Sequence, residues 1–424
     1  MAVDLRTEFC GLAFKNPIIV PAGVHGRDGE TMREISRSGI AGICTKTIVS
    51  RPAPDVLPCF TAVKAGMLNA VFGSDKSAAY WFTEGIKKAK EGEALVIANL
   101  AGFTPEEAAE LAGKAAAAGA DMIEIPTHCP HMGEILMAMY PGLDMPEPKL
   151  ADVEPMKRSV ALVKQAVKVP VVVKLSGTFS HIAKQWARGV KESGADGIAC
   201  SDAFGPALKI DIRTGEPALG GPRGVGGLTG AAIMPLTLRM VLDIAASVDL
   251  PIIGVGGVET AADAVQYMMA GATLVGVCTA GHMNGPVRYS RLLRDLEKLV
   301  AELGASRPAD LRGLTLRRIR ERKERNLVAV TKPVVPTIDE ERCNGCGRCE
   351  EVCAYGAMRV EKKAARSGDK AARSGDKAAR SGDKAARSGE GKARVTAESC
   401  IGCGLCLSVC PTDAIAQVYY GAST

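Results

Sequence analysis

Long apolar runs and aromatic residues are scarce in this 424-residue chain. No apolar stretch reaches the ~18 residues that a membrane-spanning helix needs, and the first residues, MAVDLRTEFCG, are too charged for a secretory signal. Aromatic residues make up only 4% of the chain, whereas hydrophobic residues reach 47% and glycines number 47. This composition excludes a fibrous or wholly disordered chain. We expect a cytoplasmic protein of two or three domains.

The chain also has little net charge outside one segment. Its formal charge is +6, but residues 361–392 alone hold ten Lys or Arg and five Asp or Glu, a net +5, which leaves +1 for the rest. The composition therefore gives no support to nucleic-acid binding. Within the segment, residues 363–390 form four near-identical heptads, Lys-Ala-Ala-Arg-Ser-Gly-Asp, the last ending in Glu390. Because only Ala is apolar there, we expect a disordered insertion without a function of its own.

Eight short apolar runs recur between residues 10 and about 305, each followed by a loop and an amphipathic stretch. Their β-branched content without polar alternation is typical of strands buried on both faces. The runs lie at residues 17–23, 42–48, 95–102, 122–125, 169–175, 197–201, 251–257 and 274–280. Helix starts are expected at Thr104 and at Glu259-Thr260. The pattern predicts an α/β fold, a (β/α)8 TIM barrel over residues 1–305, with an open doubly wound sheet as the alternative.

Eight of the 14 cysteines form two copies of Cys-x2-Cys-x2-Cys-x3-Cys. Three thiolates at this spacing can hold three irons of one cubane, whereas the fourth reaches the neighbouring cluster. Crossed ligation of two [4Fe-4S] clusters follows, by Cys343, Cys346, Cys349 and Cys410 for one and by Cys400, Cys403, Cys406 and Cys353 for the other. A pair of zinc sites is the alternative, but zinc has no need of a third evenly spaced Cys.

The cysteine pattern resembles a bacterial-type two-cluster ferredoxin domain. We expect this small α+β domain over residues 337–420, interrupted by the insertion at 363–390. A connector at residues 306–336 joins it to the barrel. Its basic run at residues 317–325 is interpreted as a solvated helix face, with docking of an acidic redox partner as the alternative.

Glycine-rich turns end the last two apolar runs of the barrel, at Gly254-Val-Gly-Gly257 and Cys278-Thr-Ala-Gly281. Loops in these two places form the usual phosphate site of a TIM barrel. Lys46 and Lys174 lie near the ends of two other runs, where barrel catalysis takes place. A buried lysine needs an anionic or electron-rich partner, and a salt bridge in the barrel core is the alternative for each.

With these residues in view, the barrel resembles the dihydroorotate dehydrogenase family. Within it, the likeness is to the dihydropyrimidine dehydrogenase-like branch, which joins an FMN barrel to a C-terminal two-cluster ferredoxin domain. Besides the two turns, the motifs that carry the resemblance are Asn16-Pro-Ile, Thr45-Lys-Thr47, Gly66-Met-Leu-Asn69, Asn99-Leu-Ala-Gly102, Cys129-Pro-His131, Val173-Lys174-Leu175 and Gly226-Gly-Leu-Thr-Gly-Ala-Ala-Ile233.

The resemblance implies bound FMN and assigns residues to it. Ala22 and Gly23 would lie under the flavin, Lys46 near the cofactor and the substrate, and Asn99 within hydrogen-bonding reach of the ring system. Lys174 would stabilise negative charge at the N1–C2 carbonyl edge. The ribityl phosphate would be held by Gly230, Gly256, Gly257, Thr279 and Gly281.

The resemblance also implies an FMN- and iron–sulfur-dependent oxidoreductase that acts on CH–CH groups, reducing or forming a C=C bond conjugated to a carbonyl. Two of the Asn side chains expected to read a pyrimidine ring are replaced, at Pro126-Thr127 and at Asp202, although Asn69 remains. Because buried ring amides would go unpaired, we expect a small-molecule substrate other than a standard pyrimidine.

The proton donor is a second departure from the family pattern. The loop between Met132 and Ala151 contains neither the Cys nor the Ser expected there. We assign proton transfer to His128, whose side chain titrates near neutrality, and expect Cys129 and His131 to be structural. Lys46 and Asn69 complete the expected catalytic set.

No pyridine-nucleotide fold with its own dinucleotide fingerprint is visible, so the clusters would exchange electrons with a partner. We expect an FAD-containing subunit that oxidises NAD(P)H, or a ferredoxin, in a homodimer or heterotetramer, and no nucleic acid or membrane. Two other classes remain open. One is an electron-transfer subunit that relays electrons to a partner holding the substrate, which the lost Asn residues favour. The other is a cofactor-less scaffold, against which Lys174 and the intact phosphate loops argue.

Overall fold

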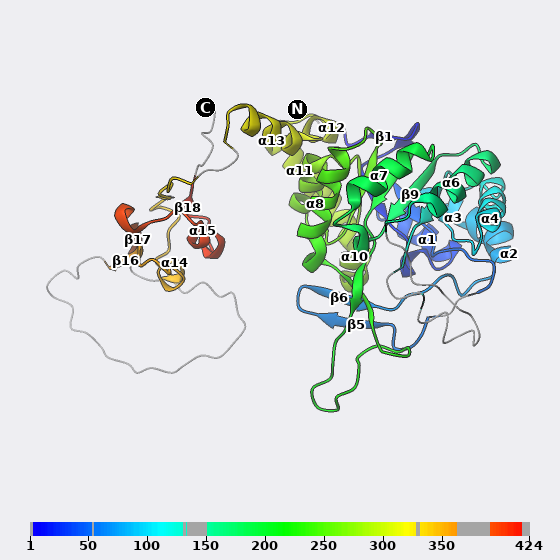
Figure 1. Ribbon diagram of the computed structural model, residues 1–424, viewed down its shortest axis with the longest axis horizontal. Coiled ribbons are helices and arrows are strands. Elements are labelled where there is room, and N and C mark those ends of the chain that lie inside the picture. Colours follow the sequence, from blue (N-terminus) through cyan, green and yellow to red (C-terminus); the bar gives the residue numbers. More distant parts are fainter. Residues whose placement is uncertain are drawn as a thin grey trace. The chain divides into compact units, whose positions relative to one another are not determined.

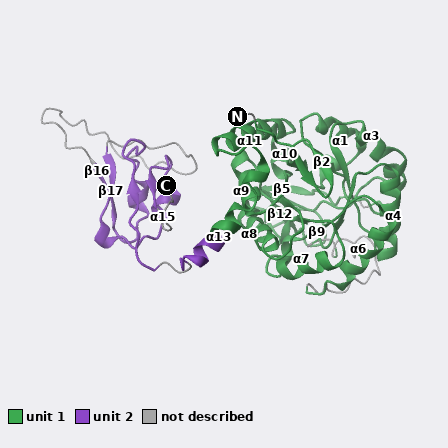
Figure 2. Cartoon of the chain, turned by 90° about the horizontal axis from the view of Figure 1, so that it is seen from above, with its two compact units in different colours: residues 1–318 green, residues 319–424 purple. Residues whose placement is uncertain are grey.

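The chain divides into two compact units, Met1–Arg318 and Ile319–Thr424 (Figure 2). The computed structural model describes residues 3–52, 55–129, 133, 151–327, 331–362 and 391–417. The expected insertion at 363–390, His131 and most of the loop before Ala151 lie outside these residues. No helix in the described part of the chain is long and apolar enough to cross a membrane.

Eight parallel strands of unit 1 close into a barrel in the order β10-β13-β14-β3-β4-β7-β8-β9 (Figure 1). The strands are β3 (Ile18–Val20), β4 (Gly42–Cys44), β7 (Leu95–Asn99), β8 (Met122–Pro126), β9 (Val171–Leu175), β10 (Gly197–Cys200), β13 (Ile252–Val255) and β14 (Leu274–Gly276). Seven lie within the predicted apolar runs and β8 extends one residue beyond its run, so the predicted TIM barrel is confirmed and the open sheet was the wrong alternative.

Helices follow the strands along the chain and cover the outside of the barrel. They are α1 (Gly29–Ser36), α2 (Ala78–Tyr80), α3 (Ile86–Lys90), α4 (Pro105–Ala117), α6 (Glu154–Ala166), α7 (Ala183–Glu192), α8 (Met234–Ala245), α9 (Ala261–Ala270), α10 (Thr279–Asn284) and α11 (Val287–Glu302). Thr104 and Thr260 cap α4 and α9, accepting bonds from the backbone N–H groups of Glu107 and Asp263. These caps confirm both predicted helix starts.

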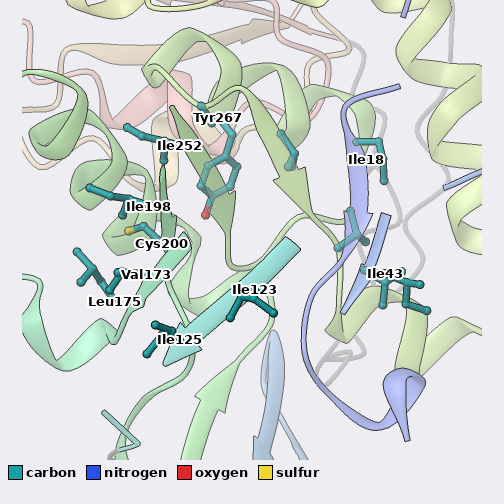
Figure 3. Close-up of a cluster of buried hydrophobic side chains, with 14 of the residues drawn as sticks. Ile18, Ile43, Ile123, Ile125, Val173, Leu175, Ile198, Cys200, Ile252 and Tyr267 are labelled. Atoms are coloured by element: carbon teal, nitrogen blue, oxygen red, sulfur yellow. The ribbon is translucent and has the colours of Figure 1, made fainter. Parts of the chain in front are cut away.

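The alternation of side chains along each strand builds two cores. Ile18, Val20 and Ile43 belong to the core that the strands share with the helices, and Figure 3 labels Ile18 and Ile43 in it. Ile19 belongs to the core inside the barrel. The interior is closed at the N-terminal ends of the strands by a hairpin, β1 (Thr7–Phe9) and β2 (Leu12–Phe14), through Phe9 and Phe14. The opposite end of the barrel, where the strands finish, is left for a site.

A second sheet stands over that end of the barrel. Its order is β11-β12-β6-β5, formed by β5 (Phe60–Val63), β6 (Gly66–Asn69), β11 (Phe204–Ala207) and β12 (Gly226–Thr229). Neighbouring strands are antiparallel. Because β5 and β6 follow the second barrel strand, and β11 and β12 the sixth, this sheet brings residues from distant loops together.

After the barrel, the chain forms α12 (Pro308–Leu311) and α13 (Leu314–Glu324). Unit 2 is small and has its own core of Cys349, Met358, Ala393 and Ile415. Its elements are β15 (Thr337–Ile338), α14 (Arg348–Glu351), β16 (Met358–Lys362), β17 (Gly391–Val395), α15 (Leu405–Val409) and β18 (Ile415–Ala416). The antiparallel pairs β15–β18 and β16–β17 confirm the predicted α+β class of this domain.

Candidate functional site

A cavity of about 470 Å³ opens at the C-terminal ends of the barrel strands. Loops after most of the barrel strands and residues of the second sheet line it. Of the residues predicted from the sequence, its wall contains Ala22, Gly23, Lys46, Asn69, His128, Lys174, Gly230, Gly256, Gly257 and Thr279. Of the residues predicted in the barrel, the remaining two, Asn99 and Gly281, lie outside the wall.

The glycines of the predicted phosphate loops adopt backbone conformations that other residues rarely reach. Gly230, Gly256 and Gly257 have φ of +89°, +134° and +74°. A Cβ atom on Gly257 would lie 2.8 Å from the carbonyl oxygen of Gly230, so the two loops touch. Side chains are therefore excluded from this corner of the cavity, as binding of a phosphate by backbone N–H groups requires.

Tyr267 holds the peptide between Gly256 and Gly257 in one orientation from behind the cavity wall. Its hydroxyl donates to the carbonyl of Gly256 at 2.6 Å and also contacts the hydroxyl of Thr237. Because a trans peptide is planar, the N–H of Gly257 points opposite to that carbonyl, away from Tyr267. Burial raises the pKa of Tyr267, so the hydroxyl remains a donor.

Tyr267→Phe is expected to weaken FMN binding about tenfold. The carbonyl of Gly256 would keep only the 3.4 Å contact with the hydroxyl of Thr237, and the loss of the shorter buried bond costs roughly 1–3 kcal/mol and frees the Gly256 peptide to turn. Fluorescence titration of the deflavinated protein with FMN measures the change. Tyr80→Phe is the matched control, since it removes a bond of 3.1 Å to the N–H of Gly29, away from the cavity wall. Unchanged FMN affinity in Tyr267→Phe would limit this tyrosine to a role in packing.

Lys174 lies in a buried polar chain inside the barrel. Its Nζ donates to Glu124 Oε1 at 3.0 Å, and Asn99 Nδ2 donates to the same oxygen at 2.6 Å. Burial lowers the pKa of Lys174, but the carboxylates of Glu124 and Asp202 outweigh it and raise the pKa overall. Lys174 is therefore a cation at the cavity wall, held by a carboxylate that is only 1% exposed.

Asn99 and Gly281 do not line the cavity, and their expected contacts with the cofactor stay predictions. Asn99 is paired with Glu124 in the register of β7 and β8 and is fully buried, so it orients Glu124 from behind the wall. A Cβ atom on Gly281 would lie 2.0 Å from the hydroxyl of Tyr289. Close packing of α10 on α11, and not the cavity, requires glycine at this position.

Lys46 has a carboxylate partner of its own. Its Nζ donates to Asp55 Oδ2 at 2.8 Å, and the backbone N–H of Phe72 donates to Asp55 Oδ1 at 2.6 Å. Lys46 and Lys174 therefore each line the cavity and also form a salt bridge, so the two alternatives expected for each lysine do not exclude each other. The partners Asp55 and Glu124 were missed in the sequence, although Glu124 leaves a signal as the one charge within the apolar run at 122–125.

Two titratable side chains stand together on the wall after β8. The ring of His128 lies 5.7 Å from the ring of Phe179, and burial lowers its pKa, so the imidazole is neutral at pH 7. Cys129, which the sequence analysis treats as structural, also lines the cavity. Asn69 is held on β6, with its Nδ2 donating to the carbonyl of Gly227 at 3.3 Å.

Asp202 and Thr127 stand where Asn side chains that bind a pyrimidine ring are expected, and both already form hydrogen bonds with the backbone. Asp202 lines the cavity, and its Oδ1 accepts a bond of 3.1 Å from the N–H of Gly177. Burial raises the pKa of Asp202 to about 7, against the opposing influence of Lys174. The hydroxyl of Thr127 donates to the carbonyl of Lys174 at 2.9 Å, so it is turned toward the backbone.

A neutral histidine pair borders the cavity beside Gly23 and was missed in the sequence. His282 lines the cavity, and its ring stands edge-on to His25 with centroids 4.4 Å apart. His25 Nδ1 in turn lies 2.8 Å from the hydroxyl of Tyr289. Burial lowers the pKa of both histidines to about 4, so this wall carries no positive charge at neutral pH.

In unit 2, four of the predicted ligands share one small cavity. Cys353, Cys400, Cys403 and Cys406 line it together, which is the set that crossed ligation assigns to one cluster. Of the other set, Cys349 belongs to the core of the unit, and Cys343 and Cys410 pack against it, as Cys353 and Cys406 of the first set also do.

Crossed ligation assigns Cys353 and Cys410 each to the cluster of the other motif copy. Backbone N–H groups surround both sulfurs. Burial raises the pKa of Cys353 and of Cys410, but hydrogen bonds from the backbone that follows each residue outweigh it and lower the pKa. The N–H of Ala414, for example, lies 3.3 Å from the sulfur of Cys410. Both thiols are thereby prepared to act as thiolate ligands, and the donor set fits iron–sulfur clusters.

Comparison with known proteins agrees with this geometry. Residues 4–300 match the family model described as dihydroorotate dehydrogenase, and residues 342–414 match that of a 4Fe-4S dicluster domain. The catalytic subunit of dihydroorotate dehydrogenase B (NAD(+)) of Methanothermobacter thermautotrophicus is 36% identical over 311 residues, 73% of this chain and 98% of that protein. The subunit of the same name from Pyrococcus furiosus is 32% identical over 313 residues, 74% of this chain and 99% of that protein. The chain therefore belongs to the dihydroorotate dehydrogenase family of oxidoreductases and carries a 4Fe-4S domain at its C-terminal end.

Proposed function

We propose that this protein is an FMN- and iron–sulfur-dependent oxidoreductase that forms or reduces a C=C bond conjugated to a carbonyl. One observation carries the proposal. A single cavity of about 470 Å³ combines a corner of glycines, the buried cation Lys174 and the pair His128 and Cys129. A phosphate site, a cation for developing negative charge and a proton-transfer group are the parts that this chemistry needs.

Each part has residues to supply it. Gly230, Gly256, Gly257 and Thr279 would hold the phosphate of FMN, and Ala22 and Gly23 would lie under its ring. Bound FMN supplies a hydride acceptor or donor and links two-electron to one-electron transfer. Lys174 stabilises negative charge at its edge, and Asn99 acts as a positioning residue through Glu124. Lys46 and Asn69 orient the substrate.

Proton transfer is assigned to His128. Because its pKa is lowered, the neutral imidazole accepts a proton from a substrate carbon when the C=C bond forms, and it returns that proton when the bond is reduced. Cys129 is the second candidate for this step, since it stands next to His128 on the same wall.

The substrate is proposed at the level of its class. The names of the relatives point to dihydroorotate. Asp202 and Thr127 stand where Asn side chains that bind the ring amides are expected. They favour a compound other than a standard pyrimidine, because an ionised carboxyl has no donor for a ring carbonyl and the hydroxyl of Thr127 already donates to the backbone.

Electrons are proposed to leave or enter through two [4Fe-4S] clusters in unit 2. The relatives are named catalytic subunits, which favours a second, FAD-containing subunit that reacts with NAD(P)H; a ferredoxin is the alternative partner. An electron relay to a partner that holds the substrate is the second candidate function, favoured by the two replaced amide readers.

Anaerobic titration of the purified holoprotein separates the two functions. We expect the flavin absorbance to bleach on addition of one of dihydroorotate, dihydrouracil, dihydrothymine or a saturated acyl compound, without any partner protein. Bleaching by dihydroorotate and by none of the other compounds would contradict the proposal of a non-standard substrate. A flavin that no substrate bleaches, but that a reduced ferredoxin does, would establish the relay instead.

The pH dependence of this reaction tests the proton-transfer assignment. In the direction that forms the C=C bond, the rate is expected to fall as the pH drops below about 6.5, the ordinary pKa of His, because the base becomes protonated at a pKa lowered by burial. His128→Gln should slow the reaction about 10²–10⁴-fold and abolish the fall in rate at low pH. Asp202→Asn is the matched control, since it removes the wall group whose pKa is about 7. If Cys129→Ser abolishes the fall in rate at low pH and His128→Gln does not, Cys129 is the proton-transfer group.

A further inference from the structure

Asp202 presents a carboxyl group to the cavity. It follows β10 and lines the cavity wall. Its Oδ1 accepts a bond of 3.1 Å from the N–H of Gly177, and the hydroxyl of Ser176 is a second donor to this carboxyl. An ionised carboxylate has about four acceptor positions and no donor. Asp202 can therefore still accept hydrogen bonds from a ligand but can donate none.

Three uncharged polar side chains of the wall have donors turned to the protein. The hydroxyls of Ser201 and Thr229 donate to backbone carbonyls at 3.0 and 3.1 Å, and Asn69 uses one N–H in the same way at 3.3 Å. All three line the cavity. Because their oxygen lone pairs are left over, these groups offer a ligand more acceptors than donors.

The two lysines of the wall supply donors for a carbonyl. Lys46 and Lys174 each bind one carboxylate, that of Asp55 and that of Glu124. An ammonium has three N–H groups, so both lysines can still donate to a ligand. The wall thus fits a ligand with a carbonyl at one edge and N–H donors at the edge that meets Asp202.

We propose that the substrate is a cyclic acylguanidine, a ring whose amino-bearing carbon lies next to a ring N–H and whose C=C bond is conjugated to a carbonyl. Asp202 accepts one hydrogen bond from the amino group and one from the ring N–H, in the bidentate arrangement that carboxylates form with paired donors. This inference rests on the proposed function, because it places the substrate at the wall that Asp202 lines. The simplest compound of the class is 2-aminopyrimidin-4-one, isocytosine.

Uracil is the matched compound, since it has a carbonyl oxygen where isocytosine has the amino group. A carbonyl flanks the ring N–H of uracil on each side, so one of them would meet the carboxylate oxygen of Asp202. Repulsion between two acceptors rejects such a ligand. The wild-type protein is therefore expected to bind isocytosine at least about tenfold more tightly than uracil.

Asp202→Asn is expected to reverse this preference. The N–H of Gly177 needs an acceptor, so the amide oxygen takes the place of Oδ1 and the amide nitrogen takes the place of Oδ2. A donor then stands where isocytosine needs an acceptor, and it suits a carbonyl of uracil. The ratio of the two affinities should change about 10²-fold.

Difference absorbance of the oxidised flavin in the anaerobic holoprotein measures both affinities without turnover. The titrations are run about one pH unit above the pKa of Asp202, which burial raises to about 7, so that the carboxyl is ionised. Asp121→Asn is the matched control, because Asp121 also accepts from a backbone N–H, that of Val96 at 2.7 Å, and lies outside the cavity wall. It should leave both affinities unchanged.

The outcomes separate this inference from the proposed function. A purified protein that holds no flavin would contradict the proposed function and this inference with it. A flavin-loaded protein that binds uracil as tightly as isocytosine, or that binds neither, would overturn the substrate class and leave the oxidoreductase proposal standing. An Asp202→Asn variant with normal flavin content and the wild-type preference would overturn the role of Asp202. The comparison of the two ligands in the wild-type protein decides the substrate class even where the variant does not fold.

Discussion

Lys174→Met is expected to slow substrate-driven flavin reduction by about 10²–10³-fold, the effect of removing one positioned charge-stabilising group. The same change should destabilise the protein by about 3–5 kcal/mol, because it leaves the buried carboxylate of Glu124 without its cation. The two effects have different origins. Lys174 acts on the cavity side as a cation and on the barrel side as the partner of Glu124, 3.0 Å away.

A double variant separates these two roles. Lys174→Met/Glu124→Gln removes both charges, so it should recover most of the lost stability while the flavin reduction stays slow. Thermal unfolding and anaerobic stopped-flow absorbance measure the two quantities. Lys90→Met, which breaks the more exposed ion pair with Asp121 at 2.7 Å, is the control and should change stability by less than about 1 kcal/mol. A double variant that reduces its flavin at the wild-type rate would leave Lys174 only a structural partner of Glu124.

The barrel was predictable because the physical requirement acts on every residue of a strand. A parallel strand covered on both faces must be apolar throughout, so each of the eight runs is visible without knowledge of its neighbours. The glycines at 256 and 257 are equally visible, because a loop that excludes side chains needs them whatever surrounds it. Local requirements of this kind leave a trace in the sequence.

Requirements that depend on a partner leave a weaker trace. Asn99 is the last residue of β7, where a cavity residue would stand, and only its bond to Glu124 and its complete burial show that it lies behind the wall. Gly281 belongs to a glycine-rich turn, but the hydroxyl that excludes a side chain there comes from Tyr289 on the next helix. Asp55 reaches Lys46 from the loop before β5. In each case the deciding contact arises only when the chain is folded.

Crossed ligation, as proposed for unit 2, predicts a large change in the iron content of a double variant. Cys353→Ala/Cys403→Ala is expected to lose one cluster and keep the other, so iron should fall from about eight to about four atoms per chain. Both residues line the same small cavity, and each [4Fe-4S] cluster needs four ligands. Cys349→Ala/Cys403→Ala takes one ligand from each set and should lose nearly all iron.

The comparison of these two variants distinguishes crossed from sequential ligation, which single substitutions cannot do. If each Cys-x2-Cys-x2-Cys-x3-Cys copy held its own cluster, Cys353 and Cys403 would belong to different clusters, and their double variant would lose both. Iron analysis and low-temperature EPR of the reduced proteins measure the outcome, with Cys59→Ala, outside both sets, as the control. Under crossed ligation, Cys353 completes the set of the second copy and Cys410 completes the set of the first, so the two double variants should differ by about four irons.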